Sequence, residues 1–157
     1  MNETAARKPL PPWLKVSVPS GERVSQIRKT CAERGLHTVC ASARCPNLGE
    51  CWSAGTATFM ILGGLCTRGC RFCSVPSAAQ PPAPAPAEPG LLSKTVAELG
   101  LRYVVLTTVC RDDLPDQGAA HIAACIKAVK DVVPPIRVEI LLQDFAAEEA
   151  ALRMIIA

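Results

Sequence analysis

Two groups of three cysteines flank one short apolar segment, and this arrangement restricts the possible fold more than any other feature of the sequence. Six of the nine cysteines in the 157-residue chain fall between Cys40 and Cys73. The first residues, MNETAARKPLPPWLKV, contain no apolar core of signal-peptide length, so we expect a cytoplasmic protein. Disulfides are rare in that reducing compartment, and clustered thiols there more often bind metal or carry out chemistry.

The composition is that of a folded globular domain. Apolar residues make up 49% of the chain and the formal net charge is +3, which together exclude intrinsic disorder. No apolar run approaches the roughly 20 residues of a membrane-spanning helix, so we expect no membrane partner. The charge is small and no basic stripe is interleaved with aromatic residues, so we expect no nucleic-acid partner either.

The N-terminal third predicts an arm, one helix and a long loop. Residues 1–19 are rich in proline and favour an extended arm, and Ser20 can cap a helix over residues 22–34. Residues 36–56 show no sustained periodicity, which predicts a loop, and loops of this length in compact domains are usually functional. We therefore expect residues 1–56 to form an irregular, cysteine-bearing extension.

From residue 57 onward, segments typical of strands alternate with segments typical of helices. The predicted strands cover residues 57–63, 102–109 and 136–142, and the predicted helices cover residues 91–99, 119–133 and, capped by Asp144, 145–157. A proline-rich stretch at residues 78–90 predicts an extended spacer. The alternation is typical of a parallel sheet with helical crossovers, a pattern that an open doubly wound sheet and a barrel share.

The second cysteine group has the spacing C-x3-C-x2-C and directly follows the first predicted strand. Its members are Cys66, Cys70 and Cys73, and cysteine thiolate is the usual ligand of iron–sulfur clusters. Three cysteines leave one metal position open, whereas a structural zinc site normally has four protein ligands. The alternative is a zinc site that borrows Cys110 or a histidine. Phe72, inside the motif, is either a core residue or an aromatic face for a planar ligand.

The first cysteine group has the spacing C-x4-C-x5-C in the predicted loop before the same strand. It consists of Cys40, Cys45 and Cys51. Two groups separated by a single strand can hold two clusters near each other. Zinc bound by this loop and free thiols packed as small apolar groups are the alternatives.

The second group resembles the signature of the radical S-adenosylmethionine enzymes, C-x3-C-x-aromatic-C. The resemblance implies a 4Fe-4S cluster on Cys66, Cys70 and Cys73, with the fourth iron chelated by S-adenosylmethionine and Phe72 near the adenine. An electron passed through the cluster then cleaves S-adenosylmethionine to methionine and a 5′-deoxyadenosyl radical.

Longer segments resemble the lipoyl synthase family across nearly the whole chain. They are HTVCASARCPNLGECWSAGTATFMILGGLCTRGCRFC, RKPLPPWLKV near the start, LRYVVLTTVCRDDLPDQGAAH at 101–121 and VEILLQDF at 138–145. The resemblance implies a partial TIM-type βα barrel. It also implies a second 4Fe-4S cluster on Cys40, Cys45 and Cys51, which donates sulfur to C6 and C8 of a protein-bound octanoyl group. No side chain is expected to act as the catalyst itself.

The same resemblance implies the partners and three further binding residues. Thr107, Arg111 and Asp112 are expected to help hold the methionine part of S-adenosylmethionine, although Asp112 can equally turn the chain before Pro115. The substrates are octanoylated lipoyl carrier domains of 2-oxoacid dehydrogenase subunits and of the glycine-cleavage carrier protein. An electron donor is the remaining partner.

Several features depart from the family pattern. Cys110 stands where the family usually has Asp or Asn, and Ser42 and Gly64 replace acidic residues. Family members are about twice as long, with six βα units and a C-terminal Arg-Ser-Ser motif that is absent here. We therefore expect a truncated chain that comprises the extension at 1–56 and the first three βα units at 57–157. The alternatives are an inactive cluster-binding fragment and a structural zinc module.

The remaining polar and cysteine residues can also be interpreted as purely structural or solvent-exposed residues. Arg68 and Arg71 either bind an acidic carrier protein or tune the reduction potential of the cluster. The alternative is that they belong to a solvated loop. His37 and His121 are expected to be structural. Cys31 and Cys125 are expected to be buried thiols on helix faces.

Overall fold

The computed structural model of the chain describes residues 11, 21–132 and 134–156. Its elements follow in the order α1 (Glu22–Glu33), β1 (His37–Thr38), α2 (Val39–Ser42), α3 (Leu48–Ser53), β2 (Thr56–Ile61), α4 (Glu88–Glu98), β3 (Tyr103–Thr108), α5 (Ala119–Val132), β4 (Arg137–Leu141), a 3₁₀ turn (Phe145–Ala147) and α6 (Glu149–Ile156). The predicted arm, except for Pro11, and the predicted cap at Ser20 lie outside the described residues.

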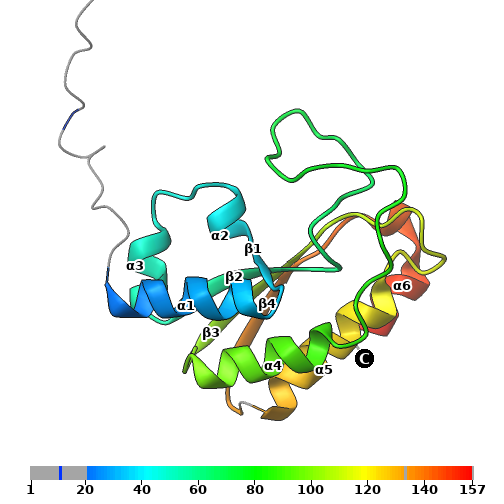
Figure 1. The fold of residues 1–157 in the computed structure, drawn as a ribbon. Helices are drawn as coiled ribbons and strands as arrows, with labels where there is room; N and C mark the ends of the chain where they lie inside the picture. Colours follow the sequence, from blue (N-terminus) through cyan, green and yellow to red (C-terminus); the bar gives the residue numbers. More distant parts are fainter. Residues whose placement is uncertain (1–10, 12–20, 133, 157) are drawn as a thin grey trace, which may run out of the picture.

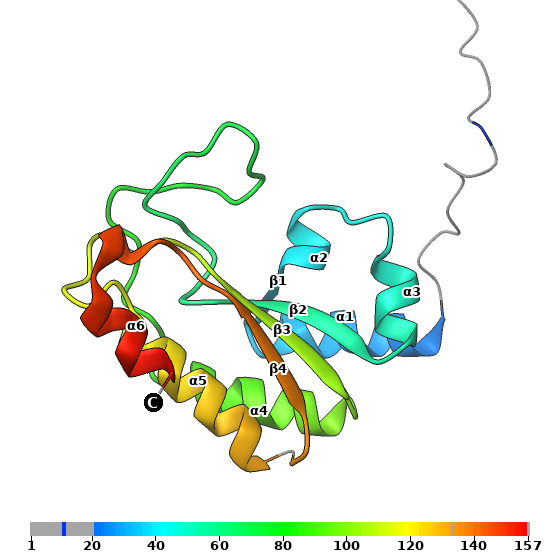
Figure 2. The ribbon, with the colours of Figure 1, turned by 180° about the vertical axis from the view of Figure 1, so that it is seen from behind.

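A single sheet with the strand order β1-β2-β3-β4 positions the rest of the described chain. Strands β2, β3 and β4 run parallel and start at one level, because Thr56 pairs with Tyr103 and Tyr103 pairs with Arg137. Strand β1 forms the edge of the sheet opposite to β4 and pairs antiparallel with β2. Helices α4 and α5 connect the parallel strands and lie along one face of the sheet (Figures 1 and 2). The predicted alternation is confirmed, and the open sheet is compatible with a partial βα fold.

The two faces of the sheet differ in burial. On the face that α4 and α5 cover, Phe59, Val104 and Leu106 are at most 1% exposed. The opposite face carries Val105 and Thr107, which stay half-buried, and Glu139, which is exposed. None of the described helices is long and apolar enough to cross a membrane. The sheet therefore has one packed face and one face that is only partly covered.

The prediction of a plain loop over residues 36–56 is wrong. The segment contains β1 and two short helices, and Trp52 of α3 is fully buried in the core. These elements have two, four and six residues. Elements so short cannot display a hydrophobic period, which explains why the pattern did not reveal them.

The boundaries of two predicted helices also change. Helix α4 begins at Glu88, within the predicted proline-rich spacer, because a proline is tolerated in the first turn. Asp144 caps only a 3₁₀ turn, through a hydrogen bond from the backbone N–H of Ala146. The residues of this turn have φ between 48° and 64°, so the helix cannot continue through them and α6 starts at Glu149.

Replacing Gly118 by alanine is expected to destabilise the fold by about 1–3 kcal/mol. Gly118 has φ of +85°, and a Cβ atom there would lie 2.7 Å from Cδ2 of the buried Leu62. Gly90→Ala is the matched control, because Gly90 lies in α4 and the added methyl group would meet no heavy atom within 4 Å apart from its chain neighbours and the helix's own backbone. We expect that variant to be about 0.4–1 kcal/mol more stable than the parent. Urea unfolding measures both, and equal effects of the two substitutions would contradict the prediction.

Candidate metal centre at the carboxyl edge of the sheet

Three loops leave the sheet at the carboxyl ends of its parallel strands. Ile61 pairs with Thr108 and Thr107 pairs with Leu141, so the strands end close to one level. Ligand sites in open parallel sheets lie outside this edge. The segment after β2 rises from it as a long excursion (Figures 1 and 2) and contains Cys66–Cys73, which we call the cysteine loop.

Cys66 is the fixed end of the cysteine loop. Its backbone N–H donates to the Pro76 carbonyl at 3.0 Å and its carbonyl accepts from the Ala78 N–H at 2.9 Å. Its Sγ atom accepts from two backbone N–H groups, those of Cys110 at 3.2 Å and Arg68 at 3.4 Å. Hydrogen bonds from backbone N–H groups to sulfur stabilise a metal-bound thiolate and tune its metal. The surroundings of Cys66 therefore suit a cluster ligand.

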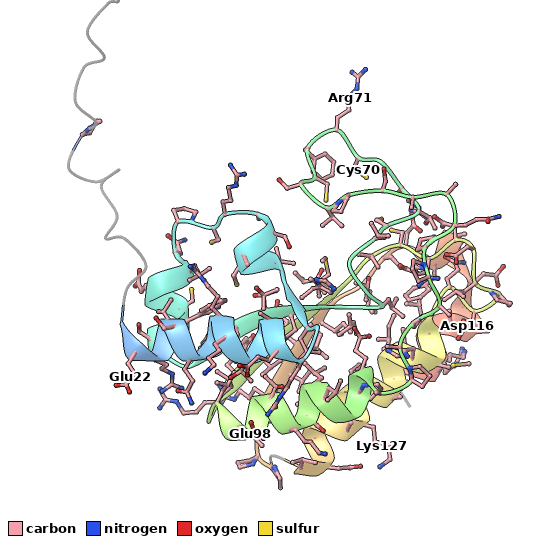
Figure 3. The ribbon with its side chains drawn as sticks, viewed as in Figure 1. Glu22, Cys70, Arg71, Glu98, Asp116 and Lys127 are labelled. Carbon is pink, nitrogen blue, oxygen red and sulfur yellow. The ribbon has the colours of Figure 1, made fainter. Side chains whose placement is uncertain are left out.

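The other two cysteines of the loop are exposed. A turn joins them, in which the Cys73 N–H donates to the Cys70 carbonyl at 3.0 Å. Cys70 and Arg71 lie at the outer end of the loop (Figure 3). Phe72 is 93% exposed, so the interpretation of its ring as part of the core is wrong. A bare aromatic ring between two exposed thiols is suited to contact a planar ligand.

Arg68 ties the three loops of this edge together. Its guanidinium donates to Asp112, at 2.7 and 2.9 Å, and to Asp144, at 2.8 and 2.9 Å. The Thr67 hydroxyl donates to the Asp112 carboxylate at 2.6 Å. The interpretation of Arg68 as a merely solvated residue is therefore wrong, while Arg71 extends into solvent (Figure 3).

These contacts shift the pKa values of both aspartates. Hydrogen bonds from Arg68 and then Thr67 lower the pKa of Asp112. Hydrogen bonds from Arg68 and then the Ala146 N–H lower the pKa of Asp144 to about 2. The same two carboxylates raise the pKa of Arg68. All three groups are therefore charged at neutral pH.

The difference in unfolding free energy between the parent and Arg68→Ala is expected to be constant above about pH 5 and to shrink below pH 4. A carboxyl group whose pKa is lowered on folding stabilises the fold above its ordinary value of 3.8, and this contribution is lost as the pH falls through the folded value. Chemical unfolding at pH 6, 4 and 3 measures the difference. A difference that grows on acidification would contradict the assignment of the pairs.

The first cysteine group lies on α2, α3 and the turn between them. Cys40 is buried, and the N–H of Cys45 donates to its carbonyl at 3.0 Å. The pKa of Cys51 is raised by burial and then by the neighbouring thiols of Cys40 and Cys45. The fold thus gathers the three thiols of this group, and their thiolates repel one another unless a metal is bound.

Neither cysteine group is arranged around a single ion. Among the described residues, three possible ligand atoms lie mutually within 4.8 Å only at Glu88, His121 and Cys125. A zinc ion bonded to three sulfurs at about 2.3 Å holds them about 3.8 Å apart. At least one pair of sulfurs in each group is therefore farther apart than one zinc ion requires.

A buried network supports the start of the loop after β2. Leu62 is 1% exposed and has φ of 71°, which costs about 1–2 kcal/mol for a side chain of this kind. Its N–H donates to Glu88 Oε2 at 2.9 Å and its carbonyl accepts from Arg111 at 3.4 Å. Glu88 also bonds His121 Nε2 at 2.7 Å. Glu88 and Arg111 therefore hold the strained backbone from which the cysteine loop departs.

The predicted S-adenosylmethionine residues occupy different surroundings. Thr107 lies on the half-buried, open face of the sheet. The carboxylate of Asp112 faces Arg68 and Thr67, at the level of the cysteine loop. The guanidinium of Arg111 is 1% exposed and bonded to Asp113 at 2.7 and 2.8 Å. Glu88 was missed because a lone acidic residue in a proline-rich stretch gives no sequence signal.

Comparisons with known proteins find sequence similarity to one family. A family model described as the N-terminal domain of lipoyl synthase of the radical SAM family matches residues 1–45. The chain is 54% identical over 145 residues to a lipoyl synthase of Anaeromyxobacter dehalogenans, covering 92% of the chain and 49% of that relative. It is 50% identical over 149 residues to a mitochondrial lipoyl synthase of Arabidopsis thaliana, covering 90% and 40%. A lipoyl synthase of Halobacterium salinarum is 51% identical over 150 residues, with 93% and 48% covered.

The description of the matching family model assigns the chain to the radical SAM proteins. The chain belongs to the lipoyl synthase family and corresponds to the N-terminal part of that family. The chain spans about half the length of the curated relatives it matches. The relatives include bacterial, archaeal and mitochondrial proteins, so the cytoplasmic setting stays a prediction.

Proposed function

We propose that the chain supplies both cluster sites of a lipoyl synthase, which inserts sulfur at C6 and C8 of a protein-bound octanoyl group. The observation that carries the proposal is the position of the cysteine loop at the carboxyl edge of the sheet. Two backbone N–H groups fix the sulfur of Cys66 there, while Cys70 and Cys73 are exposed and free to close on a ligand. Cys66, Cys70 and Cys73 would hold the cluster, which would supply the electron for cleavage of S-adenosylmethionine.

The residues around this site are proposed either to contact S-adenosylmethionine or to hold the cysteine loop in place. The exposed ring of Phe72 offers a flat apolar surface for the adenine, and Thr107 and Asp112 offer polar groups for the methionine part. Arg111 acts at a distance, because its buried guanidinium holds the backbone at the base of the loop. Arg68 joins the loop to the ends of β3 and β4.

The first cysteine group is proposed to hold the cluster that donates sulfur. Cys40, Cys45 and Cys51 lie on residues 1–56, whose strand β1 pairs with β2. The site is thus packed against the same sheet that carries the cysteine loop. A carbon radical must meet sulfur within contact distance before other groups quench it, and a resident sulfide meets that demand.

The proposed partners follow from this chemistry. The substrates are octanoylated carrier domains of 2-oxoacid dehydrogenases and of the glycine-cleavage system, and an electron donor reduces the site. The exposed Arg71 at the outer end of the cysteine loop is available to an acidic carrier surface (Figure 3). Residues 57–157 are proposed to form the first units of a radical SAM partial barrel.

Anaerobic reconstitution with iron and sulfide tests the proposal on the 157-residue chain. We expect about eight irons per chain and a broad absorption band near 400 nm, as two 4Fe-4S clusters require. Stoichiometric zinc without visible absorption would overturn it in favour of a structural zinc module.

Incubation with an octanoylated carrier, S-adenosylmethionine and a reductant then tests activity. Lipoyl product supports the complete reaction. Formation of 5′-deoxyadenosine without lipoyl product instead identifies a fragment that binds clusters but does not insert sulfur.

A further inference from the structure

Cys110 lies directly against the fixed end of the cysteine loop, and the proposed function gives it no task. Its backbone N–H donates to the Sγ atom of Cys66 at 3.2 Å. Its carbonyl accepts from the backbone N–H of Thr67 at 2.9 Å. The segment after β3 is therefore bonded to the first two residues of the loop.

We infer that Cys66 and Cys110 are an oxidative modification site, at which a disulfide forms when Cys66 holds no metal. The carbon Cα of Cys110 lies one bond, about 1.46 Å, from the nitrogen that contacts Cys66 Sγ, which places it at most about 4.7 Å from that sulfur. Because the Cα of Cys66 lies about 2.8 Å from its own sulfur, the two Cα atoms are at most about 7.5 Å apart, and native disulfides join Cα atoms that are about 4.4–6.8 Å apart. Rotation of the Cys110 side chain, with a small adjustment of the loop, thus brings the two sulfurs into bonding range.

The accessibility of the cysteines favours this pair. Cys66 and Cys110 are half-buried, so a small disulfide reagent reaches them, whereas Cys31 and Cys125 are at most 6% exposed. The exposed pair Cys70 and Cys73 has no comparable backbone contact to Cys66 or Cys110 among the described hydrogen bonds. It is the competing site of oxidation.

Glutathione disulfide is the class of oxidant that balances the reaction. One cysteine thiolate attacks it and releases one glutathione, and the second cysteine then displaces the other glutathione from the mixed disulfide. The cysteines lose two protons and two electrons, and both are recovered in two molecules of glutathione. The bonded sulfur of Cys66 is no longer a thiolate, so the modification blocks cluster loading until a thiol reduces it. This consequence rests on the proposed function, but formation of the bond does not.

Peptide mapping of the cluster-free 157-residue chain tests the inference. The reduced protein is treated with excess glutathione disulfide, alkylated and digested with trypsin under non-reducing conditions. We expect peptide 103–111, whose one cysteine is Cys110, linked through Cys66 to peptide 45–68, and released by dithiothreitol. Recovery of Cys110 as the alkylated thiol, with Cys70 and Cys73 joined instead, would overturn the inference.

Matched variants separate this inference from the proposed function. Cys110→Ser is expected to abolish the linkage and to load iron equally well before and after oxidation, while the oxidised parent loads at most about half. Cys125→Ser, the control, is expected to keep the linkage. If the linkage forms but the reduced parent binds no iron, the modification site stands and the proposed cluster site fails.

Discussion

Replacing Cys66, Cys70 and Cys73 together by serine is expected to lower the bound iron from about eight to about four atoms per chain and to abolish cleavage of S-adenosylmethionine. Serine keeps the size of the side chain but removes the thiolate that iron requires. The loss is expected to be complete because only this group has the spacing that resembles the radical S-adenosylmethionine signature, with the exposed ring of Phe72 inside it. Iron analysis after reconstitution and quantification of 5′-deoxyadenosine measure the two effects.

The first cysteine group gives the matched comparison. Serine at Cys40, Cys45 and Cys51 is expected to remove the same amount of iron but to leave formation of 5′-deoxyadenosine within about twofold of the parent, because the proposed radical-generating site is untouched. Serine at both Cys31 and Cys125, which are buried on helix faces, is expected to leave the iron content unchanged. If either triple substitution removed all iron, or if the two groups lost the same activities, the division of tasks between them would be wrong.

The parallel strands could be predicted because the residues of each strand themselves favour an extended conformation. YVVLTT and RVEIL contain several β-branched residues, and an amphipathic helix separates each of them from the strand before it. Strand β1 could not be predicted, because two residues form a strand only through pairing with Met60 and Phe59. Helix α4 starts earlier than its apolar period, in a first turn that contains Glu88 and a proline.

The sequence predicts the cysteines of the candidate site, a prediction that stays open, but it could not predict the residues that support them. The spacing of six cysteines is a local signal, whereas Arg68 and Asp144 are 76 residues apart in sequence and meet only when β2, β3 and β4 align. Asp144 was predicted as a helix cap, and it does accept from the Ala146 N–H, yet its carboxylate also bonds Arg68. Local chemistry cannot reveal such a second use, because the partner is supplied by the tertiary fold.

Replacing Arg111 by alanine is expected to destabilise the fold by about 3 kcal/mol, at the lower end of the range for breaking a buried ion pair. The Arg111 side chain is 1% exposed. Removing it leaves the Asp113 carboxylate and the carbonyls of Leu62 and Pro81 without the hydrogen bonds that it donates. The lower end applies because Asp113 keeps 22% of its side chain exposed, so water compensates part of its lost partner. Urea unfolding monitored by circular dichroism measures the change.

Two matched variants show whether burial is the cause. Arg153→Ala removes an arginine of α6 whose side chain, like that of its partner Glu149, is 73% exposed, and this loss is expected to cost less than about 0.5 kcal/mol. Arg111→Lys keeps the charge but cannot bond Asp113 with two nitrogens while also reaching both carbonyls, so an intermediate loss is expected. Because Arg111 holds the carbonyl of the left-handed Leu62, the alanine variant should also retain less iron at Cys66–Cys73 after reconstitution. Equal losses for Arg111→Ala and Arg153→Ala would mean that Arg111 does not support the base of the cysteine loop.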